Sequence, residues 1–560
     1  MNYLKIQVRF LVFLLQLLLL VSCGVSKSLH HQPDLSTYNN TVPLVAKLPN
    51  NVFTWGNNFL LKNKQALWEL YVEGDPLERG LAEGALTDSL LKKQERVFFS
   101  KINEMVPSKF KQRFLRKFLA WYNRKLYLNV TNEYQAEIYG LSRYTSHDFD
   151  YLAPQYLRSL YLHGAHDIGH AMQDLALVGC SSFAAWGEKS EDGSLILGRN
   201  FDFYAGDDFA KDKVVAFIRP DEGYPFMMLT WPGMIGAVSG MNNEGLTVTI
   251  NAGKSEVPLV AKTPVSLLTR EILQYAANID QAIAIAKNRQ VFVSESIMVG
   301  SANDKKAVLI EVSPENFGVY EVPNSNNQLL CTNHFQSDAL KDDKHNLEQI
   351  ENSHSKYRYD KLVEDFSEHP KINPTIAAEI LRDREGLSHL PIGYGNEKAL
   401  NQLLAHHGII FKPELKLVWV SANPYQLGEF VCYDLNKIFK DQKIDKNIVS
   451  LAQPQFNIPK DPFLQTQGYK NYEQFRIDDR KMDEILKGKS KIQDGFVKNY
   501  QSLNPDYWMV YYKSGLYFYN KKDYAAAKLN FEKALTKEVT TLPAKKQVEK
   551  YLQKTNKKLR

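Results

Sequence analysis

The chain has 560 residues, of which 44% are hydrophobic and 12% aromatic, which is typical of a globular protein with a large core and about three domains. Its net charge of +6, from 69 basic and 63 acidic residues, is small for this length and gives no indication of nucleic-acid binding. Four cysteines in so long a chain exclude a scaffold built on disulfides.

The first 23 residues have the pattern of a targeting segment. Lys5 and Arg9 supply positive charge, and the apolar run 10–21 is too short to span a bilayer but has the length of a signal-peptide core. The run ends in LVSCG, which resembles a bacterial lipobox, in which Cys23 would be lipidated and become the first mature residue. We therefore expect an exported bacterial lipoprotein, held on the periplasmic or cell-surface side of a membrane by its lipid. An ordinary signal peptide is the alternative.

The remaining chain divides by composition and periodicity. A polar, proline-containing stretch precedes a region of helical periodicity, and short strands at close spacing, interrupted by helices, follow it. This order predicts an α+β fold with two antiparallel sheets faced by helix layers. The predicted segments are a signal peptide (1–23), a tether (24–60), a mainly helical segment (61–179), a strand-rich domain (180–435), a linker (436–500) and a tetratricopeptide-like helix pair (501–560).

Three histidines in the helical segment have a spacing that a zinc site can use. His163, His166 and His170 lie at i, i+3 and i+7, which would place them along one helix face. Gly164 and Gly169 weaken that helix, and no separate carboxylate or cysteine pattern supports a metal. We therefore expect local polar packing here, with no metal and no cofactor.

The stretch from Val178 to Tyr204 brings a thiol, a cation and a carboxylate together. Two apolar runs flank a polar turn, which predicts a β-hairpin that folds Arg199 and Asp202 back toward Cys180. A thiolate is the reactive form of cysteine, and a nearby guanidinium favours the thiolate over the thiol. The pattern therefore predicts that Cys180 is a nucleophile.

The other two cysteines of the domain, Cys331 and Cys432, lie in apolar, strand-like runs. We expect buried free thiols at both positions rather than a bridge.

Cleavage of the chain before Cys180 would give that one residue both a thiolate and an α-amine able to carry a proton. Gly179 suits such a break, because the absence of a side chain lets the sulfur approach the carbonyl carbon. Attack would give a thioester, and water would then release the upstream segment. Asp202 is expected to hold the new amine while Arg199 stabilises the thiolate.

Acyl transfer also needs hydrogen-bond donors where negative charge develops on the carbonyl oxygen. Asn251 closes the strand-like run LTVTIN, and Asn333 lies in CTNHF. Both are neutral strand-end amides, so both are candidate oxyanion donors.

Several of these segments together resemble one family. They are Cys-x-x-Phe near GRNFDF, MNNEGLTVTINAG, CTNHF, the upstream GDPLERGLAEG and HSKYRYDKL. Over about residues 61–435 the chain is similar to the isopenicillin-N acyltransferase-like family of cysteine N-terminal-nucleophile (Ntn) hydrolases (peptidase C45 type), which is related to bile-salt (choloylglycine) hydrolases and penicillin V acylases.

The resemblance implies a four-layer αββα sandwich preceded by a pro-segment that the enzyme removes by cutting between Gly179 and Cys180. It assigns roles by position: the nucleophile is Cys180, its positioning pair is Arg199 and Asp202, the oxyanion and backbone supports are Asn251 and Asn333, and the later family arginine is Arg358. The implied substrate is a small molecule with an N-acyl amide. Because coenzyme-A thioesters are cytosolic, we expect an exported member to use water as its common acceptor and to hydrolyse linear amides.

Three other readings of the sequence remain open. A phospholipase-B-like hydrolase on a related fold would cut lipid esters. A papain-type enzyme would use His334 as its base, although no papain-like sequence surrounds Cys180. A non-catalytic lipoprotein would bind acylated ligands or protein partners. One helix pair cannot bury its own apolar face, so we expect residues 501–560 to pack on the main body, on a further helix or on a protein partner.

Overall fold

The structure is a computed structural model that describes residues 24–164, 167, 179–203, 206–256, 258, 260–323, 326–440, 447–490, 492 and 494–560. The predicted signal peptide, Cys23, His166 and His170 lie outside the described residues. Within these ranges, no helix is long and apolar enough to cross a membrane.

The larger sheet has eleven strands among the described residues, in the order β1-β2-β3-β4-β7-β8-β9-β10-β11-β12-β13. Neighbouring strands are antiparallel, except that β4 runs parallel to β7. The strands are β1 (Ala46–Leu48), β2 (Val52–Trp55), β3 (Asn58–Lys62), β4 (Trp68–Gly74), β7 (Val214–Pro220), β8 (Phe226–Thr230), β9 (Ser239–Asn242), β10 (Leu246–Ala252), β11 (Glu295–Ser301), β12 (Lys306–Val312) and β13 (Phe317–Tyr320).

In the described part of the chain, the smaller sheet has six antiparallel strands in the order β14-β5-β6-β15-β16-β17. The strands are β5 (Ser181–Ala185), β6 (Ile196–Phe201), β14 (Gln328–Cys331), β15 (His407–Lys412), β16 (Leu417–Ser421) and β17 (Phe430–Asp434). The predicted hairpin is confirmed as β5 and β6, in a register that places Ser182 opposite Arg199. Gly193 has φ +78° in the connecting turn, a conformation that favours glycine.

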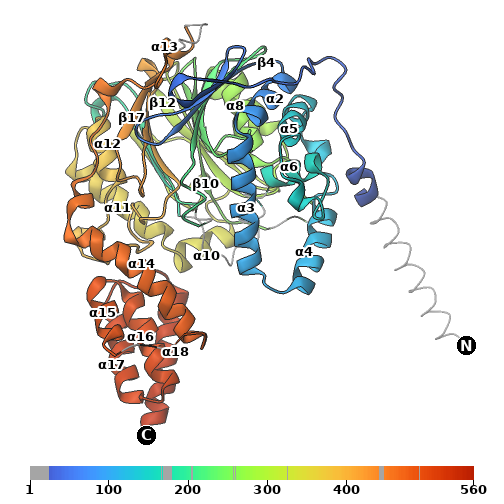
Figure 1. The fold of residues 1–560 in the computed structure, drawn as a ribbon. Coiled ribbons are helices and arrows are strands. Elements are labelled where there is room, and N and C mark those ends of the chain that lie inside the picture. The colour runs from blue at the N-terminus through green and yellow to red at the C-terminus, as the bar shows by residue number, and fades with distance from the viewer. Residues whose placement is uncertain are drawn as a thin grey trace, which may run out of the picture.

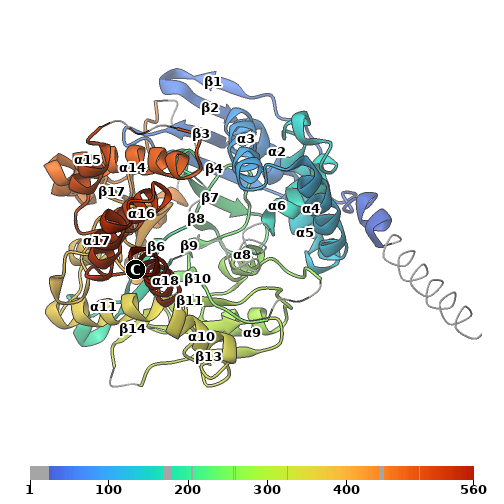
Figure 2. The same cartoon turned by 90° about the horizontal axis from the view of Figure 1, so that it is seen from below.

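The two sheets stack on each other, and helices cover their outer faces (Figures 1 and 2). In β15, Ile409 and Phe411 enter the core between the sheets, whereas Ile410 packs under the helices of the smaller sheet. Burial on both faces explains why these strands read as continuous apolar runs. The predicted four-layer αββα class is confirmed. The helices of the layers are α2 (Pro76–Leu86), α3 (Asp88–Met105), α5 (Asn132–Ser142), α6 (Gln155–His163), α8 (Val265–Tyr275) and α9 (Ile279–Lys287) on the larger sheet, and α11 (Ser355–Glu368) and α12 (Pro374–Leu381) on the smaller.

The N-terminal region differs from the expected irregular tether and helical segment, because β1–β4 extend the larger sheet. The hairpin of β2 and β3 turns at Gly56-Asn57, where Gly56 has φ +58°. A two-residue glycine turn of this kind is a hairpin signal that the compositional reading missed. Residues 46–74 thus belong to the sheet, and α2 packs closely on α5 through Gly80, where a Cβ would lie 1.9 Å from the Glu137 carbonyl oxygen.

Helix α4 (Lys109–Tyr122) leaves much of its apolar surface uncovered. Phe110 and Phe114 are 81% and 69% exposed, so these aromatics do not join the core.

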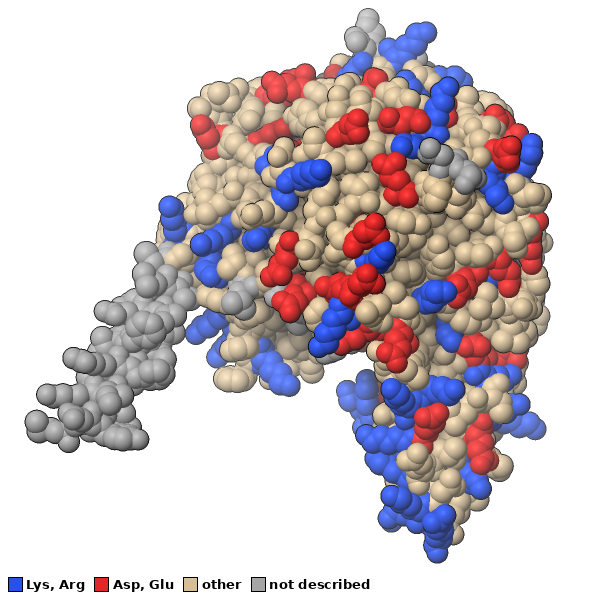
Figure 3. Space-filling view, turned by 180° about the vertical axis from the view of Figure 1, so that it is seen from behind, with Lys and Arg blue, Asp and Glu red and all other residues tan. Residues whose placement is uncertain are grey.

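The C-terminal helices form a separate cluster below the sheets (Figure 1). Part of the expected linker is the helix α14 (Gln467–Leu486), which buries Tyr472 and Phe475 in this cluster. The expected helix pair corresponds to α16 (Trp508–Asn520) and α17 (Tyr524–Leu535), in contact where Phe531 covers Gly515. Alongside α14, the helices α15 (Phe496–Leu503) and α18 (Leu542–Leu559) bury the remaining faces of the pair. Figure 3 shows many lysine and arginine side chains on this cluster.

Two further short α-helices lie among the described residues. They are α10 (Lys344–Asn352), before α11, and α13 (Leu435–Ile438), after β17.

Candidate active site

Cys180 lies directly before β5 and is buried, with 1% of its surface exposed. Because β5 pairs with β6, the guanidinium of Arg199 reaches it, and Nη2 donates to the Cys180 sulfur at 3.8 Å. The backbone N–H of Gly179 donates to the carbonyl oxygen of Asp202 at 3.1 Å. The hairpin thus brings the thiol, the cation and the carboxylate together, as the sequence predicted.

Arg199 is held rigidly by contacts to the larger sheet. Its Nη1 donates to the Val238 carbonyl oxygen at 3.0 Å and to the Ser239 hydroxyl, and its Nη2 donates to the Ile250 carbonyl oxygen. The guanidinium carbon also lies 4.2 Å from the centre of the Phe201 ring. These contacts fix a fully buried cation beside the sulfur.

Burial raises the pKa of the Cys180 thiol, and the charge of Arg199 offsets that rise in part. The intact chain therefore holds this cysteine mainly as a neutral thiol at neutral pH.

Asp202 is a fully buried carboxyl group whose two oxygens have no hydrogen-bond partner among the described residues. Burial raises its pKa to about 7, against the lowering effect of the Arg358 and Arg199 charges. An unpartnered buried carboxyl is costly, so its presence beside Cys180 calls for an explanation.

Arg358 comes from α11, on the smaller sheet, and contacts the backbone of Cys180. Its Nη1 donates to the Cys180 carbonyl oxygen at 2.5 Å and to the Ser181 hydroxyl at 2.8 Å. Its Nη2 donates to the Asn333 side-chain oxygen at 2.7 Å. Burial lowers the pKa of Arg358 to about 10, so it remains a cation at neutral pH. The residue assigned from the resemblance therefore lies at the site.

Both predicted asparagines lie at the site, and in this structure both amide nitrogens donate to backbone carbonyls. Asn251 donates to the Thr332 carbonyl oxygen at 3.1 Å and accepts from the Ser182 hydroxyl at 2.7 Å. Asn333 donates to the Ala252 carbonyl oxygen at 2.9 Å. The two side chains thus tie β10, β14 and β5 together, which is the support role predicted for them. Their role as oxyanion donors stays a prediction.

The structure adds residues that the sequence did not single out. Gln402 is 2% exposed, and its Nε2 donates to the Gly179 carbonyl oxygen at 2.9 Å. A buried chain of hydrogen bonds also runs from His406 through His407 to Ser239, which contacts Arg199. Gln402 is separated from Gly179 by more than 200 residues and belongs to no recognisable motif, so no local signal pointed to it.

The described residues contain no group of three or more His, Cys, Asp or Glu side chains able to hold a metal. His163 is buried, and both ring nitrogens are engaged: Nδ1 with the Ser159 carbonyl oxygen at 2.8 Å and Nε2 with the Ile235 N–H at 3.0 Å. In the part of the chain that the structure describes, Cys180, Cys331 and Cys432 are free and buried, as expected for the latter two.

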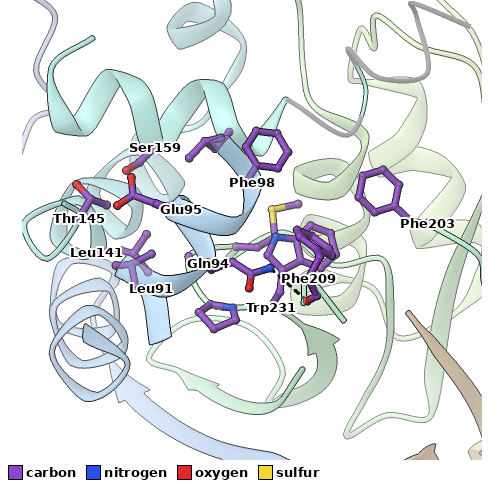
Figure 4. Close-up of a pocket in the computed structure, with 14 residues that line it drawn as sticks. Leu91, Gln94, Glu95, Phe98, Leu141, Thr145, Ser159, Phe203, Phe209 and Trp231 are labelled. Carbon is purple, nitrogen blue, oxygen red and sulfur yellow. Dashed lines mark hydrogen bonds between the residues drawn. The ribbon is translucent and has the colours of Figure 1, made fainter. Parts of the chain in front are cut away.

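An apolar cavity of about 50 Å³ lies between α3 and the loop after β8 (Figure 4). Phe203, Phe209 and Trp231 line it, and Trp231 also stacks on Phe201, whose ring contacts Arg199. Aromatic contacts therefore connect this cavity to the cysteine site.

Two stacked, mainly antiparallel sheets between helix layers, with a buried cysteine directly before a strand, define the Ntn-hydrolase class of fold. Within that class, the family model for acyl-coenzyme A:6-aminopenicillanic acid acyl-transferase matches residues 187–419. The family predicted from the sequence is therefore confirmed over this part of the chain. The matched region begins just after Cys180 and contains the other five predicted catalytic residues. The match supports an enzyme of the acyltransferase type.

Curated relatives add little about activity. The chain is 25% identical over 270 residues to an uncharacterized protein of Archaeoglobus fulgidus, covering 45% of this chain and 44% of that protein. It is 25% identical over 308 residues to protein dcd1B of Dictyostelium discoideum, covering 50% and 57%. The chain thus spans about half the length of the curated relatives it matches.

Among solved structures, a Caenorhabditis elegans ortholog of N-acylethanolamine-hydrolyzing acid amidase superposes with a TM-score of 0.32 at 19% identity, covering 42% of this chain and 94% of that chain. A mutant of the conjugated bile acid hydrolase from Clostridium perfringens gives 0.31 at 13% identity, covering 46% and 93%. Because superpositions at these TM-scores are loose, the family assignment rests on the family model.

Proposed function

We propose that this protein is a self-processing cysteine Ntn hydrolase, which cuts its own chain between Gly179 and Cys180 and then acts through Cys180. The observation that carries the proposal is the buried carboxyl of Asp202, which lacks a hydrogen-bond partner among the described residues of the intact chain. Cleavage would create an α-amine on Cys180, and the Asp202 carboxyl lies close enough for its charge to act on the pKa of the Cys180 thiol. A cationic amine would give this carboxylate the partner that it lacks among the described residues of the uncleaved chain.

The self-cleavage step conserves atoms and protons in a simple way. The Cys180 sulfur bonds to the Gly179 carbonyl carbon, the bond from that carbon to the Cys180 nitrogen breaks, and the thiol proton goes to the leaving nitrogen. Water then hydrolyses the resulting thioester, which gives a carboxylate on Gly179 and restores the thiol. Arg199 favours the thiolate needed for the attack, and Arg358 holds the Cys180 carbonyl in place.

The mature reaction follows the same chemistry on a second amide. The Cys180 thiolate attacks the acyl carbon of a linear N-acyl amide, and its α-amine passes the thiol proton to the leaving amine. Water, or a second amine, then takes the acyl group from the thioester. We propose a small N-acylated molecule as the substrate and water as the common acceptor, because an exported enzyme would meet no coenzyme-A thioester.

We further propose that the acyl chain enters the cavity lined by Phe203, Phe209 and Trp231. Its aromatic lining suits an apolar group. The stack of Phe203, Trp231 and Phe201 leads from this lining to Arg199, beside the sulfur.

The proposed place of action is the periplasmic or cell-surface side of a membrane, with the lipid on Cys23 as the anchor. The residues that follow this cysteine support a short connection, because they pack on the main body. Ser28 is buried, and the His31 ring stacks on Tyr127 at 4.2 Å. The catalytic part would then remain close to the membrane surface.

A panel of N-acyl amides tests the activity. Wild type and Cys180→Ala are incubated with amides of varied acyl length, and released amine is measured. Cys432→Ala is the matched control, because it also removes a buried free thiol but lies on β17. We expect hydrolysis by wild type and by Cys432→Ala and none by Cys180→Ala. Hydrolysis by Cys180→Ala at the wild-type rate would contradict the proposal, as would transfer of acyl groups without any amide hydrolysis.

A further inference from the structure

Both backbone groups of Gly179, the residue before the proposed cleavage point, make hydrogen bonds. The Gly179 N–H donates to the backbone carbonyl oxygen of Asp202, and the Gly179 carbonyl oxygen, which belongs to the peptide bond before Cys180, accepts from the side chain of Gln402 at 2.9 Å. A carbonyl oxygen can only accept a hydrogen bond, so the amide nitrogen of Gln402 must face it. The contact is close, because a Cβ built on Gly179 would lie 2.3 Å from that nitrogen.

The loop that carries Gln402 is itself fixed to the strand that carries Arg199. Asn200, which follows Arg199 on β6, donates to the Leu400 carbonyl oxygen at 2.9 Å. The Asn401 side chain accepts from the Leu403 N–H at 2.9 Å, and the Asn401 N–H donates to the Asp383 carbonyl oxygen at 2.7 Å. The direction of the Gln402 amide is therefore set by a rigid loop.

The C-terminal helices contribute to this support. The hydroxyl of Tyr472, on α14, donates to the Leu403 carbonyl oxygen at 3.2 Å. A helix outside the region matched by the family model thus braces the loop beside the cleavage point.

We propose that Gln402 is a catalytic residue for self-cleavage, donating a hydrogen bond to the Gly179 oxygen as negative charge develops on it. This rests on the proposed function, in which the Cys180 sulfur attacks the Gly179 carbon. In the tetrahedral intermediate the carbonyl electron pair moves onto that oxygen, which the Gln402 amide already contacts. The charge returns to the carbonyl when the bond to the Cys180 nitrogen breaks and the nitrogen takes the thiol proton. The amide groups of Asn251 and Asn333 donate elsewhere in the intact chain, which leaves this task to Gln402.

The test measures how fast the freshly made full chain separates into two pieces, by intact mass over time. Loss of one well-placed oxyanion donor slows acyl chemistry by about 10²–10³-fold, and we expect Gln402→Ala to slow cleavage by that factor. Gln135→Ala is the matched control, because Gln135 is a buried glutamine that donates to backbone carbonyls near α5. We expect this control to cleave at the wild-type rate.

Gln402→Glu separates donation from packing, because it keeps the size of the side chain. An ionised carboxylate cannot donate, so cleavage should be slow at pH 8 and should recover as the pH falls and the carboxyl becomes a donor. A role in packing alone would give no such recovery. Cleavage of both Gln402 variants within threefold of wild type would overturn the inference. If wild type itself stays uncut, the proposed self-cleavage fails. If wild type cleaves but the Gln402 variants cleave equally fast, only the role of Gln402 fails, so the two results are distinguishable.

Discussion

Asp202 offers a direct physical test of the site, because its buried carboxyl has no hydrogen-bond partner in the part of the chain that the structure describes. The perturbation is Asp202→Asn, made in a Cys180→Ala chain that cannot cleave. The asparagine keeps the shape of the side chain but removes its titration. The measured quantity is the difference in the free energy of unfolding in urea between the Cys180→Ala chain and the Cys180→Ala, Asp202→Asn chain, at each pH from 4 to 8.

The magnitude follows from the pKa. Burial raises the pKa of Asp202 from 3.8 to about 7 in the folded chain. Each pKa unit corresponds to about 1.4 kcal/mol, so the shift amounts to about 4 kcal/mol. Between pH 4 and pH 7 the folded chain binds a proton here that the unfolded chain has released. The stability of the aspartate chain therefore falls as the pH rises through this window and is level above it.

We expect the asparagine chain to gain stability relative to the aspartate chain by about 4 kcal/mol between pH 4 and pH 8, read as a growing difference in urea midpoint. Asp148→Asn is the control, because Asp148 is exposed, and its difference should stay flat. A flat difference for Asp202→Asn would refute the reasoning, since it would mean that the carboxylate is ionised and stabilised in the intact chain. In the cleaved enzyme the neighbouring amine should remove this dependence.

Three further predictions concern the mature enzyme and its location. Arg199→Lys removes the Nη2 contact with the Cys180 sulfur. Inactivation of the cleaved enzyme by iodoacetamide should then slow by about tenfold, because a rise of one unit in the thiol pKa lowers the thiolate population by that factor. An unchanged rate would contradict the role of Arg199. Trp231→Ala enlarges the proposed acyl cavity, so the acyl chain preferred in the amide panel should lengthen by several carbons. Trp231→Phe should change this preference little. Equal preferences of wild type and both variants would exclude this cavity as the acyl site. Cys23→Ser should move the protein from the membrane fraction to the soluble fraction of the producing bacterium, and continued membrane association would argue against the lipid anchor.

The hairpin at the site could be predicted because its signals are local. Apolar runs flank a polar turn, and the predicted return of Arg199 to Cys180 matches the register of β5 and β6. The position of Arg358 could not be predicted from local signals, because no pattern in its helix indicates a contact with Cys180. Only the family resemblance placed it at the site, and the structure has it there, at 2.5 Å from the Cys180 carbonyl oxygen.

Other features depend on contacts between distant parts of the chain, which periodicity does not report. Gln402 contacts Gly179 across more than 200 residues, and β4 pairs with β7 in parallel across more than a hundred residues. The aromatics Phe110 and Phe114 lie one helical turn apart on α4, yet both side chains are largely exposed. Spacing along a helix defines a face, but the packing of the whole chain decides whether that face is buried.

The most direct measurement is the N-terminal sequence and intact mass of the purified, active protein. Self-cleavage predicts two pieces that remain together, one of which begins Cys-Ser-Ser-Phe at Cys180 and the other of which ends at Gly179. The Cys180→Ala chain should stay in one piece. Full activity in a single chain that still contains the bond between Gly179 and Cys180 would contradict the proposed mechanism.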